Sequence, residues 1–370
     1  MNRIRNPWWA GDTGIERVLR TPRGLRGPRV FRSLLVTLLL ACVTASASGC
    51  AGLTSLLERK APPASAVKRV ALVVVAKPQD DAFVDLMIAG AQKARDESNG
   101  KIELTVETAS PGCLEEALRA AATAGYDLIV THSPSAVEPV KRVSAMFSRQ
   151  QILLVDAFCD LRNVRSVQFR ETEGMFLLGA AAALTSKTGR IGLVGSADVQ
   201  SYLKLARAYE QGAKHVRPNV TYIDAYANSF DDAPKAKELA TALSKRNVDV
   251  IMALADGGNT GVFAAAKDRR FYSFGAWQDL CAQDPKRIIA SIVKRPDGAV
   301  NEALRLLASG ELPAGRYTYG LKEGGLAFCL LTDPDHVKTD LSPGVLAKVE
   351  EVQGAIVSGE IKVQDAPAGR

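Results

Sequence analysis

The chain has 370 residues, a hydrophobic fraction of 47% and a formal net charge of +7. That fraction is typical of a globular protein, and the length suits about two domains. The positive charge is concentrated at the N-terminus: residues 1–49 hold eight arginines and two acidic residues, whereas residues 50–370 hold 39 basic and 38 acidic residues. This distribution excludes a basic nucleic-acid-binding domain, so we expect no nucleic-acid partner.

The first 49 residues have the features of a bacterial export signal. Four arginines between positions 23 and 32 precede an apolar core, Ser33–Ala45, which is too short for a stable membrane anchor. Small residues then lead to Cys50, as at a lipoprotein cleavage site. We therefore expect a lipoprotein signal peptide over 1–49, lipidation of Cys50 and a tether over 50–67. Ala51 favours the outer membrane in a cell that has one; a plain secretory signal cut nearby is the alternative.

From Lys68 onward, apolar runs of strand length alternate with segments of helical periodicity. Strands are expected at 70–76, 102–108, 127–131, 152–156, 166–169, 190–195, 221–226, 248–254, 272–276, 288–292, 315–320 and 326–331. Helices are expected at 82–98, 113–124, 136–148, 172–186, 201–216, 233–245, 261–267, 298–309 and 343–358. This alternation predicts an α/β fold with parallel sheets, and the number of strands favours two doubly wound lobes with a ligand cleft between them.

Polar and aromatic residues recur where the expected strands end. Six such ends carry Asp80 and Phe83; Asp156 and Phe158; Asn228, Ser229 and Phe230; Asp256, Gly257 and Gly258; Trp277, Gln278 and Asp279; Lys294 and Arg295. In open α/β sheets, ligands bind at the carboxyl ends of the strands. Aromatic faces stack on flat rings and carboxylates accept hydrogen bonds from hydroxyls, so the pattern suits a nucleoside or a sugar. A helix cap or a core contact is the alternative for each residue taken singly.

Signatures of enzymes and metal sites are weak. The chain has no nucleophile elbow of the form GxSxG, its glycine-rich segment 189–195 lacks the Lys-Ser/Thr of a phosphate-binding loop, and His132 has no matched nucleophile. We expect neither an enzyme nor a cofactor. Absence of CxxC spacing and the presence of only three histidines argue against a zinc site. Beyond Cys50, the four cysteines at 113, 159, 281 and 329 allow three disulfide connectivities, among which the sequence does not choose.

A longer pattern resembles a known family. The stretch NVRSVQFRETEGMFLLGAAAALTSKTGRIGLVGS, Asn163–Ser196, together with VDVIMALADGGNTGVFAAAK and TYGLKEGGLAF, is similar to the basic membrane proteins, lipoprotein receptors for purine nucleosides in ABC importers. The resemblance implies a type I periplasmic-binding protein with three chain crossings, which we place near Arg170, Pro285 and Gly315. The lobes would comprise 68–169 plus 286–314 and 170–285 plus 315–365.

The resemblance also implies a ligand site and partners. Its residues are Asp80, Phe83, Asp156, Phe230, Gly257, Gly258, Asp279 and Lys294. Phe83 and Phe230 would stack on the base, and Asp156 and Lys294 would hold ribose or ring heteroatoms. An ABC permease and, through the lipid anchor, a membrane would be partners. A ligand sensor or a non-binding scaffold of the same fold is the alternative.

Two departures from the family pattern bear on the ligand. Val84 replaces an asparagine that follows the first phenylalanine, and Trp277 replaces an aspartate that would bind ribose hydroxyls. Loss of a buried acceptor leaves hydroxyls unpaired, which penalises ribose. We therefore expect a flat heterocycle with little or no sugar, such as a free purine base.

Overall fold

The computed structural model describes residues 67–75, 81–332 and 336–364. The expected signal peptide, the lipidation site at Cys50, most of the tether and Asp80 lie outside the described residues. Among the helices of the described ranges, none is long and apolar enough to cross a membrane.

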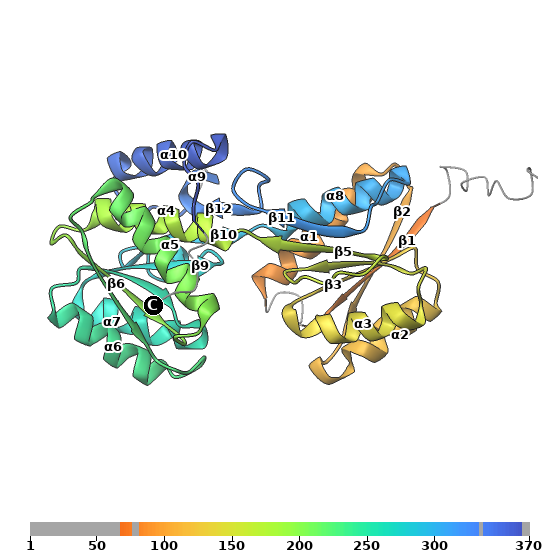
Figure 1. The fold of residues 1–370 in the computed structure, drawn as a ribbon, viewed down its shortest axis with the longest axis horizontal. Coiled ribbons are helices and arrows are strands. Elements are labelled where there is room, and N and C mark those ends of the chain that lie inside the picture. Colours follow the sequence, from red (N-terminus) through yellow and green to blue (C-terminus); the bar gives the residue numbers. More distant parts are fainter. Residues whose placement is uncertain (1–66, 76–80, 333–335, 365–370) are drawn as a thin grey trace, which may run out of the picture. The chain divides into compact units, whose positions relative to one another are not determined.

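The first sheet is built from six parallel strands. They are β1 (Lys68–Val74), β2 (Ile102–Thr108), β3 (Leu128–His132), β4 (Gln151–Val155), β5 (Val164–Phe169) and β11 (Gly315–Tyr319), in the order β11-β5-β4-β3-β1-β2. Helices α1 (Ala82–Glu97) and α8 (Pro296–Ser309) pack together on one face, and α2 (Leu114–Thr123) and α3 (Val137–Met146) cover the other (Figure 1). Because both faces are covered, the inner strands are continuously apolar; Val70–Val74 of β1 is fully buried.

The second sheet has the same plan. Its strands are β6 (Arg190–Gly195), β7 (Thr221–Tyr226), β8 (Val250–Leu254), β9 (Tyr272–Trp277), β10 (Ile288–Lys294) and β12 (Leu326–Phe328), in the order β12-β10-β9-β8-β6-β7, with only β12 antiparallel. Helices α4 (Glu171–Thr185), α5 (Gln200–Val216) and α10 (Pro343–Ser358) lie on one face, and α6 (Ala233–Lys245) and α7 (Asn259–Arg269) on the other (Figure 1). The predicted pair of helix-covered parallel sheets is confirmed. The prediction of a strand at 326–331 is wrong for its second half, because the chain from Cys329 onward forms the short helix α9 (Cys329–Thr332).

Helix α4 has no polar face in its sequence because it is buried on nearly all sides. Twelve of its fifteen residues are buried, because it packs between the sheet, α5 and α10. Two glycines allow the close approach of α4 and α5. A Cβ on Gly179 would lie 1.8 Å from the Tyr209 carbonyl oxygen, and a Cβ on Gly212 would lie 1.9 Å from that of Phe176. Any larger residue at either position would force the two helices apart.

The chain passes three times between the sheets, and two passages differ from expectation. The first lies at Arg170, between β5 and α4. Because β10 belongs to the second sheet, the second lies at Arg295 and not near Pro285. Because β11 belongs to the first sheet, the third lies at Gly320 and not near Gly315. Residues 286–294 and 315–319 therefore exchange lobes relative to the sequence-based assignment: strand periodicity identifies a strand but not the sheet that it joins.

The first and third passages are tied to each other by hydrogen bonds. The Arg170 amide donates to the Tyr319 carbonyl at 2.9 Å, and the Arg170 guanidinium binds the Glu173 carboxylate at 2.9 Å. Glu173 in turn accepts from the Leu321 amide at 2.8 Å. At the second passage, the Arg295 amide donates to the Gly325 carbonyl at 2.9 Å. These bonds fix the connecting segments next to the carboxyl ends of the strands.

Candidate ligand-binding cleft

Residues with a strained backbone conformation cluster at the carboxyl ends of the strands. Eight non-glycine residues of the described chain have positive φ, and five of them follow or end a strand: Ser133, Asp156, Asn228, Asp256 and Trp277. Such conformations cost free energy for residues with a Cβ, on the order of 1 kcal/mol each, and they cluster at functional sites. For Trp277, with φ of 72°, this conformation is especially unusual. The strain indicates that these loops are shaped for a purpose other than stability.

A cavity of about 570 Å³ lies at this edge, lined by residues of both lobes. The first lobe contributes Asp81, Phe83, His132 and Asp156, and the second contributes Trp277, Gln278 and Lys294. Asp81 is also the N-cap of α1: its carboxylate accepts from the Phe83 amide at 2.9 Å and thereby fixes the start of the helix that carries Phe83. The cavity is large enough for a small heterocyclic ligand.

Lys294, at the end of β10, is the buried cation of this cavity. Its ammonium group lies 3.0 Å from the Asp156 carboxylate in the other lobe and 2.6 Å from Glu171 at the start of α4. It also lies 4.9 Å from the centre of the Trp277 ring, within the range of a cation–π contact. One cation therefore bridges the lobes and faces two carboxylates, so that the cluster carries a net negative charge when all three groups are ionised.

Burial and charge act against each other in this cluster. Burial by itself lowers the pKa of Lys294, but Glu171 and Asp156 more than offset that effect and the pKa is raised. Burial raises the pKa of Asp156, and this effect outweighs the attraction of Lys294. The lysine is thus held protonated, and its ammonium group pairs with both oxygens of the Asp156 carboxylate, at 3.2 and 3.0 Å.

Two aromatic side chains, one from each lobe, line the cleft on both sides. Phe83 and Trp277 border the first cavity and also a second one of about 570 Å³, which Asp279, Cys329 and His336 help to line. The Phe83 ring packs edge to face against the Phe169 ring, with ring centroids 6.0 Å apart. Its other neighbour, His132, is at the same centroid distance. Burial lowers the pKa of His132, and its Nε2 accepts a long hydrogen bond from the Val75 amide at 3.5 Å.

A second group of expected site residues lies together in the second lobe. The Phe230 carbonyl accepts from the Gly257 amide at 2.9 Å, and Gly258 follows in the same short turn, Asp256–Gly258. The Asp256 carboxylate accepts hydrogen bonds from the hydroxyls of Tyr202 and Ser196. Phe230 is 56% exposed, and its ring contacts that of Tyr202, with ring centroids 5.9 Å apart. None of these four expected residues lines either cleft cavity, but their exposed ring offers a further stacking face.

The structure therefore separates the expected site into groups. Phe83, Asp156, Trp277 and Lys294 share one cavity; Phe230, Asp256, Gly257 and Gly258 form the second-lobe group; Asp279 lies in a third group with His336 and two cysteines. Sequence reasoning missed Glu171, because an acidic residue in the first turn of a helix is usual there for helix stability. It also missed Tyr202 and Ser196, which no periodicity singles out.

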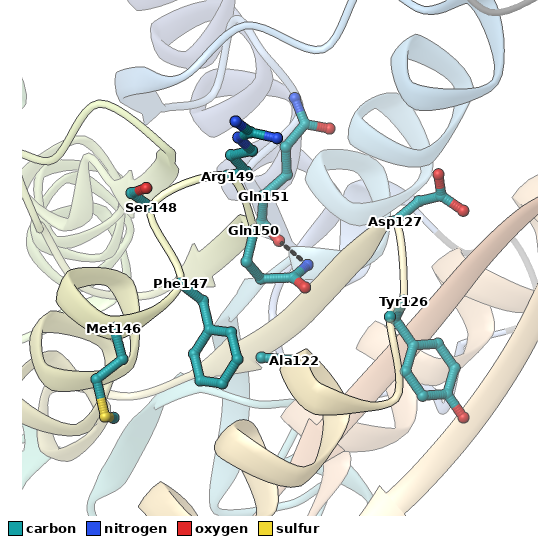
Figure 2. Close-up of a pocket in the computed structure, with 10 residues that line it drawn as sticks. Ala122, Tyr126, Asp127, Met146, Phe147, Ser148, Arg149, Gln150 and Gln151 are labelled. Atoms are coloured by element: carbon teal, nitrogen blue, oxygen red, sulfur yellow. Dashed lines mark hydrogen bonds between the residues drawn. The ribbon is translucent and has the colours of Figure 1, made fainter. Parts of the chain in front are cut away.

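Another cavity, of about 650 Å³, lies at the opposite edge of the first sheet (Figure 2). Phe147, Gln150 and Tyr126 help to line it, next to the starts of β3 and β4. In Figure 2 the side chains of Arg149 and Gln151 extend away from Phe147, and the side-chain amide of Gln150 donates through Nε2 to the Gln151 backbone carbonyl at 2.9 Å. This edge has neither a buried ion pair nor a strained non-glycine residue among its lining residues, so we do not assign ligand binding to it.

The fold and the cleft define the class of protein. Two parallel-dominated sheets, joined by three passages and sharing a polar and aromatic cavity, are the features of a type I periplasmic-binding protein, which binds small molecules between its lobes. A solved solute-binding protein of an ABC transporter from Aeropyrum pernix K1 is 27% identical, with a TM-score of 0.62 over 80% of this chain and 92% of that one. A solute-binding protein from Conexibacter woesei, at 20% identity and a TM-score of 0.67, shows the same fold.

Residues 67–366 match the family of PnrA-like ABC transporter substrate-binding proteins, and the chain belongs to this family. The resemblance to the basic membrane proteins is thereby confirmed. The CD4+ T-cell-stimulating antigen of Listeria innocua is 32% identical over 280 residues, which is 71% of this chain and 77% of the relative. The ABC transporter nucleoside-binding protein BmpA of Lactococcus lactis is 27% identical over 252 residues, 63% of this chain and 71% of the relative.

Proposed function

We propose that the chain is a lipid-anchored receptor that captures a purine-like base or nucleoside in the cleft for an ABC importer. The observation that carries the proposal is the position of Lys294, a buried cation beside Trp277 that bridges the two lobes through Asp156. Aromatic faces on both walls suit a flat ring, and the carboxylates suit its N–H groups. Membership of the family and the nucleoside-binding relative support this ligand class.

Within that class, we propose that a free base binds at least as well as its nucleoside. The support is Trp277, which stands where the family pattern implies a ribose-binding aspartate and which lines the cavity with its ring. Asp156 remains as a carboxylate acceptor, but it already pairs with Lys294 at 3.0 Å. The cleft is thus rich in stacking surface, and it lacks the carboxylate that the family pattern implies at position 277 for the ribose hydroxyls.

The test is thermal unfolding of the full chain against purine bases, nucleosides, pyrimidines and sugars, after unfolding and refolding to remove any bound ligand. A ligand at about 100 times its dissociation constant should add about 2.7 kcal/mol to the free energy of unfolding. Stabilisation by purines, absent with sugars and clearly reduced in Phe83→Ala, would support the receptor. Nucleosides that bind tenfold or more tightly than their bases would overturn the preference for a base.

No stabilisation by any compound would favour the alternative of a scaffold lipoprotein. An uptake assay distinguishes a sensor from an importer component. Deletion of an importer receptor abolishes uptake of the ligand into cells, whereas deletion of a sensor leaves uptake intact. The lipid anchor is tested separately by mass spectrometry of the N-terminal fragment, with Cys50→Ser as the control that removes the acceptor thiol.

A further inference from the structure

Four potential metal ligands from distant parts of the chain meet beside the cleft. They are Asp279 and Cys281, just after β9, and Cys329 and His336, after β12. One ligand atom from each residue lies within 4.8 Å of all the others. Both cysteines are buried, while Asp279 and His336 reach the surface of the second cleft cavity. The sequence argument against a zinc site rested on the absence of CxxC spacing and on the small number of histidines. The fold nevertheless brings together two cysteines that are 48 residues apart in the chain, with a histidine and an aspartate beside them.

Distances within the cluster are close to those of a tetrahedral site. The Cys281 and Cys329 sulfurs are 3.6 Å apart. Two thiolates at about 2.3 Å from a tetrahedral Zn²⁺ would be about 3.8 Å apart. The His336 Nε2 and the Asp279 Oδ2 lie 2.6 Å apart, as a hydrogen-bonded pair. Separating these two atoms by less than about 1 Å would reach the spacing that Zn–N and Zn–O bonds of about 2.1 Å require.

Neighbouring groups hydrogen-bond to three of the four ligands and help to orient them in the cluster. His336 Nδ1 lies 2.8 Å from the Val337 carbonyl and can donate to it, which leaves the Nε2 lone pair for a metal. The Cys281 amide donates to Asp279 Oδ1 at 3.0 Å, which leaves Oδ2 toward the cluster. The Ser291 amide donates to the Cys329 sulfur at 3.1 Å, an arrangement that stabilises a thiolate.

We propose that Asp279, Cys281, Cys329 and His336 form a site for Zn²⁺ or a similar thiophilic divalent cation. Binding would release three protons, two from the thiols and one from the hydrogen bond between His336 and Asp279, and would replace that hydrogen bond with two metal bonds. All four side chains would then be metal ligands, so the site would be closed and structural in character. It would hold the segment from Asp279 to Cys281 in place, two residues after the cleft residue Trp277. The proposal rests on these four residues and is independent of the ligand that the cleft binds.

A disulfide between the two cysteines is the competing chemistry. The sulfurs are too far apart for a bond of about 2.05 Å, but an approach of about 1.5 Å would make one. A disulfide would use neither His336 nor Asp279 and would leave their orienting hydrogen bonds without a role. The four-residue arrangement therefore favours the metal.

The test is titration of the reduced, metal-free full chain with Co²⁺ and then Zn²⁺. We expect one Co²⁺ per chain, with the visible absorption of tetrahedral cobalt and a sulfur-to-cobalt charge-transfer band, followed by displacement by Zn²⁺. X-ray absorption at the zinc edge should give two sulfur and two nitrogen or oxygen neighbours. Cys329→Ser and His336→Ala should each weaken metal binding at least 100-fold. Cys113→Ser and His215→Ala, which alter an exposed cysteine and an exposed histidine elsewhere, should leave it unchanged.

Three results would overturn the proposal. They are weak or non-stoichiometric binding of Zn²⁺, equal loss of binding in the Cys113→Ser control, and a Cys281–Cys329 disulfide, found by mass spectrometry, that forms in air despite bound Zn²⁺. Asp279→Asn is the variant to use if the other substitutions prevent folding, because it preserves the size of the side chain. It should lower metal affinity while leaving the circular dichroism spectrum unchanged.

Discussion

The two edges of the first sheet carry cavities of similar size and different character. At the carboxyl edge, about 570 Å³ is bordered by strained residues and a buried ion pair that reaches the other lobe. At the amino edge, about 650 Å³ is bordered by side chains that already serve the lobe itself: Tyr126 bonds to Thr105 and packs under Arg69, and Asp127 pairs with Lys68. Volume alone does not distinguish a binding site from a surface hollow, whereas strain and buried charge do.

The largest expected effect comes from removing the cation of each edge. Lys294→Met would leave Asp156 and Glu171 facing each other with no counter-charge. We expect it to lower the free energy of unfolding by about 2 kcal/mol, less than for a fully buried pair because the carboxylates are partly exposed. The matched change Lys68→Met at the amino edge breaks a more exposed pair and should cost less than about 1 kcal/mol. Chemical denaturation of both variants measures the difference; equal losses would contradict the distinction between the edges.

Aromatic rings provide the next comparison. Phe83→Ala should weaken binding of a purine-like ligand by roughly 10- to 100-fold, because stacking on an aromatic ring contributes about 1–3 kcal/mol per base. Phe147 is a half-buried phenylalanine at the amino edge, so Phe147→Ala is the control. Isothermal titration calorimetry should find its affinity unchanged. A similar loss of affinity in both variants would mean that binding depends on the stability of the lobe and not on the Phe83 ring in the cleft.

A smaller effect is expected at Trp277, where the ring and the backbone can be separated. Trp277→Asn removes the ring but keeps a residue that tolerates positive φ. Affinity for a base should fall about tenfold, while thermal stability without ligand should stay the same or rise because the strain is reduced. Trp277→Val, a β-branched residue that resists this conformation, should also lower stability. If Asn and Val destabilise the chain equally, the positive φ is not a constraint of the loop.

The smallest expected effect is a pH dependence from His132. Burial lowers its pKa in the folded chain below the usual 6.5, so the unfolded chain binds a proton more readily as the pH falls. Its contribution to stability is therefore complete above about pH 6.5 and decreases below that value. Thermal unfolding between about pH 7.5 and about pH 5.5 should show a shallower slope in His132→Asn than in the unaltered chain. His215 is exposed, so His215→Asn should retain the slope of the unaltered chain. A shallower slope in this control would mean that the pH dependence comes from the overall charge of the chain and not from the burial of His132.

The sequence predicted the fold better than the site, for a physical reason. Strands and helices follow from local periodicity, and the strand-end residues Phe83, Asp156, Trp277 and Lys294 meet because parallel strands end at one edge. Local patterns do not specify which sheet an isolated strand joins, which is why the passages at Arg295 and Gly320 were misplaced. They also do not reveal partners such as Cys281 and Cys329, which only the folded chain brings together.

The positions of the cleft charges relative to the interlobe passages have a mechanical consequence. Glu171 follows the passage at Arg170 by one residue, and Lys294 precedes the passage at Arg295 by one. A rotation of one lobe about these joints would therefore move both charges little, and the same holds for the Asp156 carboxylate, which lies 3.0 Å from Lys294. The Lys294–Asp156 ion pair therefore joins the two lobes close to the passages, where a change in the angle between the lobes would lengthen it least.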